Sequence, residues 1–417
     1  MIIIKNTLVV VLLFMLIFGF RLPIIYNSAV FVFLISIVVI FFHQPSFSIL
    51  QKLAKRRYVL RILLLFILIY VISLLISIFH GTYDITMSNK FIGLFATVII
   101  SLFVYSSIYI SLKDKNDLIK FIILVFVVQS FIQIISLLSP EFLSIIRQFQ
   151  DARSSEIGTS DYYHGIRALS LSTELFFGLS GAYGLVLIFF MKYMLDTSSF
   201  NNKNIFLFFI ISTSMFFVGR TVAIGLAFAL LYFVFYKGHI FKLRIMIKII
   251  VFLALALVII FNMLSTNLQF LITDTVLPTV FDFSSSGQGP RSLHTLNNML
   301  SFEISEKTIL LGDGFYTTNG SYYMTIDSGY YRQILFGGII YLLLNFIYFI
   351  IYFAYGKYLI FSSKNDKYNF YLLSCIVFLY ISFLHIKGET VGSGKIMMII
   401  LFLYGINNIL FLKKGYK

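Results

Sequence analysis

The sequence predicts an all-α polytopic membrane protein with about twelve transmembrane helices. Of its 417 residues, 59% are hydrophobic and only 12% are charged, whereas soluble domains carry about 25% charged residues. At roughly 20 apolar residues per helix, this composition supplies about twelve spans. Neither a water-soluble enzyme nor a disordered chain fits these numbers.

The apolar residues fall into twelve stretches, each of which we expect to be one span. They cover residues 2–20, 24–42, 59–79, 91–112, 118–139, 173–191, 205–218, 221–236, 245–264, 331–353, 370–385 and 395–412. The seventh and eighth stretches form one run of 32 residues broken only at Gly219-Arg220-Thr221. A single crossing of that length would be too long and would leave Arg220 near the membrane centre. We therefore expect a tight hairpin with Arg220 at its tip.

The first stretch and the cysteine content limit two other interpretations. Residues 6–20 lack a small-residue cleavage site, so we expect them to form the first span and not a cleaved signal. The chain has one cysteine, Cys375, which excludes an intramolecular disulfide. We expect Cys375 to pack in the core.

Charge distribution orients the spans. With a cytoplasmic N-terminus, the cytoplasmic segments hold 21 of the 32 basic residues but only 4 of the 17 acidic ones. This is the bias of the positive-inside rule. The net charge of +15 therefore reflects membrane orientation, and no nucleic-acid partner is expected. Both termini should be cytoplasmic.

Arginine and lysine are distributed differently on the expected outer face. Seven of the eleven arginines lie outside, against four of the twenty-one lysines. The outer arginines are Arg21, Arg147, Arg153, Arg167, Arg220, Arg291 and Arg332. Guanidinium binds phosphate bidentately and stays charged in a partly apolar site. The excess favours an anion-binding outer face, although chance in a small count is the alternative.

Two outer segments are longer than turns and divide the chain into five parts. Residues 1–139 form spans one to five, 140–172 a first long loop, 173–264 spans six to nine, 265–330 a large loop, and 331–417 spans ten to twelve. Long loops are usually functional. We expect the chemistry at the outer face, formed by these loops and the Arg220 hairpin.

The large loop offers an arginine and a histidine. Arg291 follows Gly287, Gly289 and Pro290 in GQGPRSLHTLNN, where a Gly/Pro turn at a helix start would favour an anion. His294 lies three residues later, on the same face of that expected helix. It is a candidate base or phosphate donor, or a surface histidine.

Two carboxylates and two further arginines complete the candidates. Asp327 stands where the large loop re-enters the membrane; it could accept a proton, bind a sugar, or cap the following helix. Glu174 lies at the entry to span six, as a site residue or a helix-dipole partner. Arg167 lies two helical turns before Glu174, and Arg153 belongs to the same loop.

Motifs for metal and nucleotide chemistry are absent from the sequence. It contains no Asp-x-Asp pair, no His-x-x-x-His, no carboxylate cluster at metal-binding spacing and no Walker-type loop. We therefore expect no metal and no cofactor.

The ensemble of these features resembles the Wzy O-antigen polymerase and O-antigen ligase superfamily. The carriers of the resemblance are the span count, FFVGRTVAIGLAFALL, the late loop with Gly-Pro-Arg and LLGDGF, and the re-entry segment DSGYYRQILFGGII. RALSLSTELFFG resembles the Arg…Glu-Pro element of many such polymerases, with Leu175 in place of the proline. Arg167 and Gly178 fit an Arg-x10-Gly pattern, but Arg291 has Phe302 at that distance.

The resemblance implies a GT-C-like fold and a metal-independent glycosyl transfer on the periplasmic face of the bacterial inner membrane. The growing glycan would leave undecaprenyl diphosphate and join a lipid-linked repeat unit, with a chain-length regulator protein as a candidate partner. Arg220 and Arg291 would clamp the donor diphosphate. Arg167 and Arg153 would hold the second lipid diphosphate. Asp327 or His294 would take the acceptor proton, with Glu174 in reserve.

Two alternatives remain open. An O-antigen ligase would transfer the glycan to lipid A core, but that branch typically has a histidine at the re-entry segment, where this chain has Asp327. A flippase or other transporter would also have about twelve spans, but transporters usually place ionisable groups at the bilayer midplane and have pseudo-symmetric halves. The sequence favours the polymerase.

Overall fold

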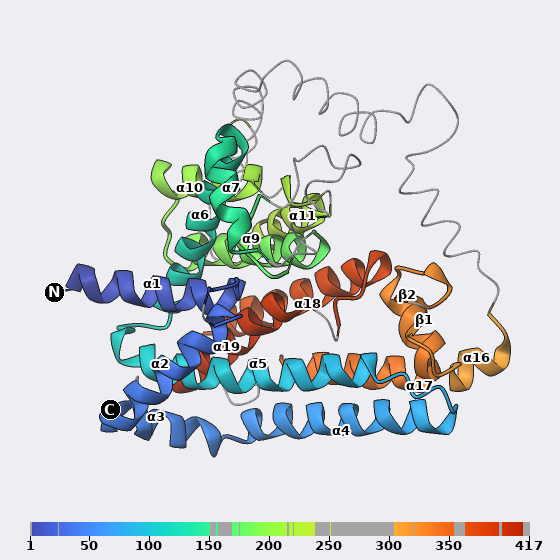
Figure 1. Ribbon diagram of the computed structural model, residues 1–417. Coiled ribbons are helices and arrows are strands. Elements are labelled where there is room, and N and C mark those ends of the chain that lie inside the picture. The colour runs from blue at the N-terminus through green and yellow to red at the C-terminus, as the bar shows by residue number, and fades with distance from the viewer. Residues whose placement is uncertain are drawn as a thin grey trace, which may run out of the picture.

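The computed structural model is almost entirely helical (Figure 1). It describes residues 2–23, 25–150, 156, 169–174, 176–214, 217–219, 221–237, 251, 304–318, 320–353, 363–391 and 394–411. The described helices of 13 residues or more are α1 (Ile2–Phe18), α2 (Ser28–Phe42), α4 (Arg57–Phe79), α5 (Thr86–Ile108), α6 (Asp117–Leu138), α9 (Phe177–Asp196), α10 (Asn202–Ser214), α11 (Val222–Phe235), α17 (Gly329–Ile351), α18 (Lys364–Lys387) and α19 (Lys395–Phe411).

Shorter elements connect these helices. They are α3 (Gln44–Ala54), the 3-10 turn η1 (Tyr109–Ser111), α7 (Pro140–Gln148), α16 (Glu306–Leu311), the hairpin strands β1 (Thr317–Thr318) and β2 (Ser321–Tyr322), and the 3-10 turn η4 (Tyr323–Thr325). The two strands are antiparallel, with Thr317 opposite Tyr322. Gly320 closes their turn with φ +78°, a conformation that glycine adopts without strain.

Several long apolar helices identify a multi-pass membrane protein. Six described helices are long and apolar enough to cross a membrane, or seven if the bent pair α2 and α3 is one span. The bend between α2 and α3 is 110°. Each predicted span coincides with a helix except 245–264, of which the structure describes only residue 251. Because α1, α10, α11 and α19 are short, helix length alone does not establish twelve spans.

The outer surface of the bundle is apolar, as lipid contact requires. On α4, Leu60, Leu64, Leu68 and Leu75 are all exposed. These side chains form a row that would be a large apolar patch in water. Cys375 is also exposed, on α18, so the prediction that it packs in the core is wrong; helical hydropathy does not distinguish lipid-facing from core-facing positions.

Helix α9 is the centre of one group of helices. It packs against α6, α10, α11, α18 and α19. Gly184 of α9 and Gly225 of α11 meet so closely that a Cβ on either would overlap the other's backbone. Tyr380 of α18 donates a hydrogen bond to the Gly181 carbonyl at 2.9 Å. Small residues permit this close backbone approach between membrane helices.

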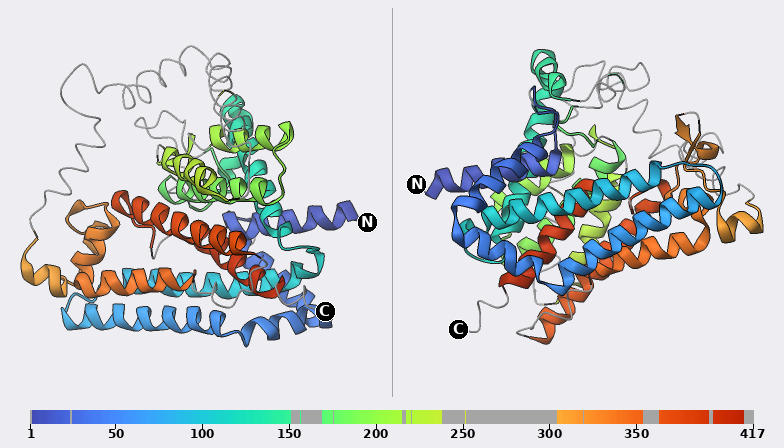
Figure 2. Two further views of the ribbon diagram at one scale, coloured as in Figure 1. Left: turned by 180° about the vertical axis from the view of Figure 1, so that it is seen from behind. Right: turned by 60° about the horizontal axis from the view of Figure 1, so that its bottom comes forward.

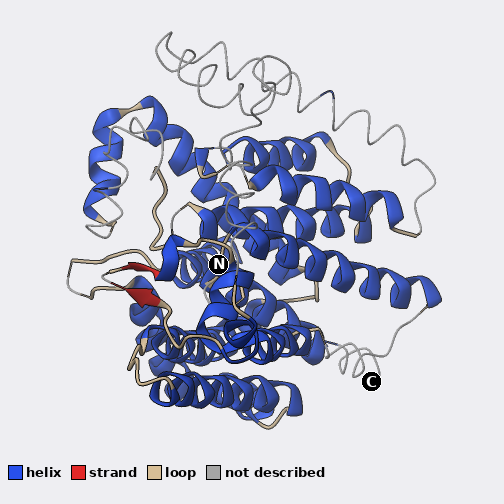
Figure 3. Cartoon of the chain, turned by 90° about the vertical axis from the view of Figure 1, so that its right-hand side faces the viewer, coloured by secondary structure: helices blue, strands red, loops and turns tan. Residues whose placement is uncertain are grey.

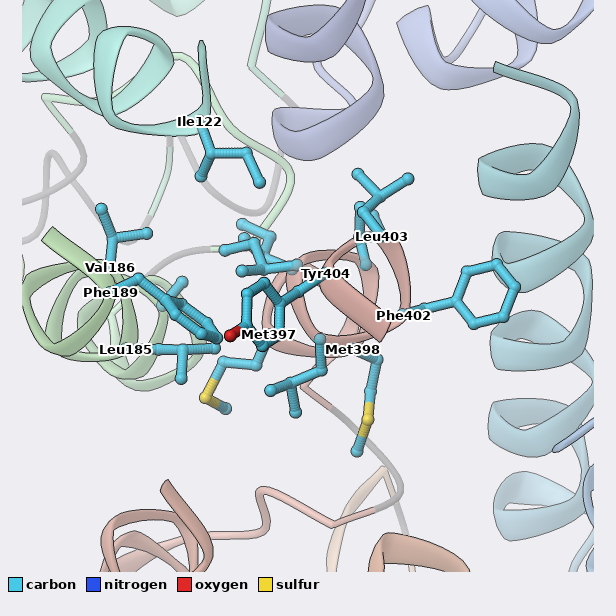
Figure 4. Close-up of a cluster of buried hydrophobic side chains, with 14 of the residues drawn as sticks. Ile122, Leu185, Val186, Phe189, Met397, Met398, Phe402, Leu403 and Tyr404 are labelled. Atoms are coloured by element: carbon cyan, nitrogen blue, oxygen red, sulfur yellow. The ribbon is translucent and has the colours of Figure 1, made fainter. Parts of the chain in front are cut away.

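Helix α19 joins this group to a second one. Its side chains Met397 and Tyr404 face Val186 and Phe189 of α9 in the buried cluster of Figure 4. The Phe189 and Tyr404 ring centroids are 4.7 Å apart. The second group contains α4, α5 and α17, and α18 lies between the two groups (Figures 1 and 2). At one end of the second group lie α16 and the β-hairpin, which Figure 3 shows in red.

Candidate functional site

Helix α17 is broken at Gly337-Gly338, and the turn at residues 310–314 packs against the break. Gly337 (φ −140°, ψ 19°) and Gly338 (φ 72°, ψ −175°) are not helical, so carbonyls near them lose their helical partners. Leu335 O accepts a hydrogen bond from Asp313 N at 2.6 Å, and Phe336 O accepts one from Gly314 N at 3.0 Å. The LLGDGF turn therefore supplies the donors that a helix interrupted in lipid requires.

Glycine is required on both sides of this contact. A Cβ on Gly312 would lie 2.5 Å from Phe336 O, and one on Gly338 would overlap Leu310 O. Both residues also have positive φ, which other residues adopt at a cost. The two segments quoted for the family resemblance, LLGDGF and DSGYYRQILFGGII, are thus fitted to each other.

Asp84, in the connection between α4 and α5, holds the β-hairpin in place. Its carboxylate accepts hydrogen bonds from Thr86 N at 2.9 Å and from Tyr316 N and Thr317 N at 2.7 Å each. Burial raises the pKa of Asp84, but these bonds outweigh burial and leave the pKa below its ordinary value. The hairpin is therefore attached to the membrane helices through an ionised carboxylate.

Four side chains at this end form what we call the outer ion cluster: Lys90, Tyr316, Arg332 and Glu389. Lys90 Nζ lies 2.7 Å from Glu389 Oε2, and Arg332 Nη1 lies 3.9 Å from the same atom. The Tyr316 hydroxyl donates to Glu389 and accepts from Lys90. The Glu389 side chain is 1% exposed and that of Arg332 6%. The cluster thus joins α5, α17, the hairpin and the connection between α18 and α19.

The cations keep Glu389 ionised despite its burial. Burial alone raises the pKa of this carboxyl, but Lys90 and Arg332 together hold it below its ordinary value. Tyr316 shows the opposite effect, because burial and the nearby Glu389 charge raise its pKa well above the ordinary range. At neutral pH two cations face one carboxylate and a neutral phenol, so the cluster has one unit of positive charge.

Contacts with neighbouring residues hold the Arg332 side chain in place, but one of its guanidinium nitrogens is not used by them. Its Nε donates to Ile326 O at 3.1 Å, and its guanidinium carbon lies 3.0 Å from the Tyr322 ring centroid. Nη2 is buried and has no hydrogen-bond partner among the residues that the structure describes. Guanidinium stacked on a ring with a spare donor edge is suited to binding an oxyanion.

Other buried polar groups without partners surround the first turn of α17. His385 Nδ1 accepts from Thr390 N at 3.1 Å, so the neutral ring carries its proton on Nε2, which is buried and unpaired. The ring lies directly over Gly329, where a Cβ would overlap it. Ser328 Oγ and Gln333 Oε1 are also buried without partners. Most of these groups are hydrogen-bond donors, and the N-terminus of α17 adds the positive end of the helix dipole. Both features favour an anion as ligand.

The two described candidate carboxylates have different environments. Glu174 is half-buried, and its carboxylate accepts from Lys395 N at 2.7 Å and Ile396 N at 3.4 Å, which caps the start of α19. Burial raises its pKa, although the backbone N–H groups and charge of Lys395 oppose the shift. Asp327 is exposed immediately before α17 and makes no hydrogen bond with the described residues. It therefore does not cap that helix.

The other five predicted site residues lie outside the described residues. They are Arg153, Arg167, Arg220, Arg291 and His294, and the amphipathic helix expected from residue 291 lies outside them too. Next to Arg220, the Thr221 hydroxyl is 2.6 Å from that of Ser180 in the first turn of α9. Among the residues that the structure describes, no three His, Cys, Asp or Glu side chains gather as metal ligands.

Sequence reasoning did not select Lys90, His385 or Glu389. Lys90 and Glu389 are 299 residues apart, and each is a single charge at the end of an apolar segment. The only available signal was their position, because both lie on the expected outer face. Arg332 was noted among the outer arginines, without a link to Lys90 or Glu389.

Comparisons of the chain with known protein families, curated proteins and solved structures find no match in any of the three.

Proposed function

We propose that this protein is a Wzy-type polysaccharide polymerase that transfers a growing glycan from undecaprenyl diphosphate to a lipid-linked repeat unit. The observation that carries the proposal is the assembly at one end of the bundle. There, LLGDGF packs on DSGYYRQILFGGII, and Arg332 and the exposed Asp327 come from the same segment. An arginine with a spare donor and a carboxylate five residues away are what diphosphate departure and acceptor activation need.

The reaction forms one glycosidic bond and breaks one glycosyl-phosphate bond. The acceptor hydroxyl attacks the anomeric carbon of the donor glycan, and its proton passes to Asp327 or His294. Undecaprenyl diphosphate leaves with the bonding electron pair. In this proposal Arg220 and Arg291 neutralise this charge, Arg332 contributes its spare donor, and Arg167 and Arg153 hold the acceptor lipid. The glycosyl-diphosphate bond supplies the free energy, so no nucleotide and no metal is required.

Glu174 is the weakest of the three base candidates on this geometry. Both of its hydrogen bonds go to the start of α19, and a carboxylate occupied in this way is poorly placed to receive a proton. Asp327 is exposed and makes no hydrogen bond with the described part of the chain. We therefore assign the role of base to Asp327 first.

The finer architecture belongs to the same proposal. We infer twelve spans in a GT-C-like arrangement, with residues 245–264 as the ninth span and the short helices α1, α10, α11 and α19 as full crossings. The charge bias along the sequence supports a cytoplasmic position of both termini and, in this proposal, a periplasmic position of the outer ion cluster at a bacterial inner membrane. Partners are then undecaprenyl-diphosphate-linked glycans, the bilayer and a chain-length regulator.

A transporter is less consistent with the broken helix. Transporters use helix breaks to line a binding site at the midplane, whereas the break in α17 is filled by the backbone of Leu310–Gly314. Transporters also usually place ionisable groups at the midplane, whereas α6 has no charged residue from Phe121 to its end at Leu138.

Deletion with complementation tests the proposal and separates it from the ligase. Loss of a polymerase leaves single repeat units on the lipopolysaccharide core, whereas loss of a ligase leaves none. The wild-type chain should restore long glycans and Asp327→Asn should not, with equal protein in the membrane. Glu141→Gln, an exposed carboxylate on α7, is the matched control and should restore them. A deletion strain with a bare core would contradict the polymerase.

A further inference from the structure

Helix α6 carries a second polar region, which we call the amide seam: Gln129, Gln133 and Ser136 of α6 with Tyr183 of α9. The three α6 residues recur at helical spacing and therefore share one face. They are 0%, 0% and 2% exposed, and Tyr183 is fully buried. The Phe126 and Tyr183 rings, 5.0 Å apart in edge contact, show that this face of α6 meets α9.

Within the part of the chain that the structure describes, the polar atoms of the seam make no hydrogen bond of good geometry. This holds for both amide atoms of Gln129, both of Gln133, the Ser136 hydroxyl and the Tyr183 hydroxyl, all of which are buried. Ser130, Ser214 and Gln133 lie within hydrogen-bonding reach of the Tyr183 hydroxyl, but Ser214 donates to Ser130 at 2.7 Å and Ser130 to Phe126 O at 2.8 Å. The serines thus satisfy each other, and the amides are left over.

The chemistry of the seam is neutral. Neither α6 from Phe121 to Leu138 nor α9 from Phe177 to Met191 contains a charged residue. Two amides and two hydroxyls offer donors and acceptors together. This composition matches hydroxyl groups, which both donate and accept, and does not match an anion, for which donors alone suffice.

The seam begins inside the bundle and reaches its outer end. Gln129 and Ser136 are seven residues apart, about 10 Å along a helix, and Ser136 lies two residues before the end of α6. Phe126 contacts Phe18 at 5.2 Å between rings, and Phe18 O accepts from Thr173 N at 3.0 Å. Beside Thr173, Ser172 Oγ is likewise buried without a partner. Buried polar groups without a described partner therefore occur both on α6 and at Ser172, where the first long loop returns to the bundle.

We propose that the amide seam binds neutral hydroxyl groups, supplied either by ordered water or by uncharged sugars of a lipid-linked glycan. Unpaired amides in a membrane helix are unfavourable unless a ligand occupies them, and buried polar groups commonly hold ordered water. The glycan source rests on the proposed polymerase function; the water source does not.

The test uses the full chain in nanodiscs, with Gln133→Met and Gln129→Met as independent variants of nearly the same shape. Radiolytic hydroxyl-radical footprinting in ¹⁸O-labelled water marks side chains next to bound water. Tyr183 is the reporter, and Tyr380, whose hydroxyl is already bonded to Gly181 O, is the control ring. The thermal midpoint Tm is then measured without ligand, with undecaprenyl diphosphate, and with undecaprenyl diphosphate bearing a neutral trisaccharide.

Each result decides the proposal. Labelling of Tyr183 but not Tyr380, lost in both variants, supports water. No labelling, with an extra Tm rise from the trisaccharide that both variants lose, supports the glycan. If Tyr183 stays unlabelled, the variants raise Tm by about 2 °C or more through loss of an unpaired amide, and no sugar-dependent Tm shift depends on the amides, the seam is empty and the proposal is wrong.

The control for amide removal is Asn407→Leu in α19. Asn407 is also fully buried, but its amide accepts from Tyr105 at 2.9 Å and donates to Lys115 O at 2.8 Å. Its removal should lower Tm in every case. Because none of these readouts requires polymer synthesis, a failure of the seam is distinguishable from a failure of the polymerase function.

Discussion

The outer ion cluster and the amide seam are both buried polar regions among membrane helices, but their polar groups are paired to different extents. In the cluster, each charged side chain contacts an opposite charge, and the carboxylate of Glu389 is shared by Lys90 and Arg332. In the seam, the amides of Gln129 and Gln133 have no partner among the described residues. The fold therefore pairs the charges of the cluster, apart from the spare nitrogen of Arg332, whereas the proposed pairing of the seam amides needs a ligand.

This difference predicts opposite responses to the removal of one group. Loss of a charge from the cluster leaves its partners uncompensated, and loss of an amide from the seam removes an unsatisfied group.

The largest effect is expected for Glu389→Ala. It leaves the guanidinium of Arg332, 6% exposed, without its counter-charge, and breaking a buried ion pair costs about 3–5 kcal/mol. Thermal unfolding followed by circular dichroism in detergent should show a fall of several degrees in Tm. Asp366→Asn, an exposed carboxylate on α18, is the control and should change Tm little. An unchanged Tm in Glu389→Ala would show that the outer ion cluster does not stabilise the fold.

The next effect concerns activity. Arg332→Lys keeps the charge but loses the planar fork, and we expect synthesis of long glycan to fall by about 100-fold, as for loss of one preorganised donor. Arg291→Lys should have a similar effect. Arg147→Lys on α7 is the matched control. Glycan length on gels and membrane protein level are the measurements, and wild-type length in both test variants would count against a guanidinium clamp.

A smaller loss of stability is expected from Gly338→Ala. The new Cβ would overlap Leu310 O at a residue with φ 72°. We therefore expect the free energy of unfolding to fall by about 2 kcal/mol. Gly93→Ala, in α5 with no atom within 4 Å of the new Cβ, is the control and should be neutral or slightly stabilising. Equal midpoints for the two variants would show that the helix break tolerates a side chain.

The smallest effect is a change in acid sensitivity. Because the pKa of Glu389 is lower when the chain is folded, this carboxyl binds fewer protons in the folded state. Its stabilisation is fully present above its ordinary value of 4.5 and declines as the pH falls further. Below this pH, Tm should therefore fall less steeply with pH in Glu389→Gln than in wild type. The difference in slope should correspond to about one proton, which the wild-type carboxyl binds on unfolding. Parallel curves would mean that Glu389 does not titrate with unfolding.

The sequence predicted the helices better than the site, for a physical reason. Apolar runs are local, so each described span coincides with a predicted one. The bend between α2 and α3 and the break at Gly337-Gly338 depend on partners distant in the chain, although the paired glycines were a visible signal. Glu389 and Lys90 could not be paired because their contact joins residues 299 apart.

The candidate carboxylates illustrate the same limit. Glu174 was predicted to be either a site residue or a helix-dipole partner at the entry to span six. Its carboxylate instead accepts hydrogen bonds at the start of α19, and this contact spans 221 residues, so it could not be predicted from the neighbouring sequence. Asp327 was placed at the membrane re-entry from sequence alone. Only the structure shows that it is exposed and that Arg332, one turn into α17, contacts a carboxylate from the connection between α18 and α19.

Reconstitution with one defined lipid-linked repeat unit tests the central claim most directly. Purified protein in liposomes, given this single substrate in the presence of a metal chelator, should form a ladder of long glycans and release undecaprenyl diphosphate in step with each bond formed. Arg332→Lys should yield only unextended substrate. If wild-type protein forms no glycan longer than the starting unit, with or without chelator, the assignment as a polymerase is contradicted.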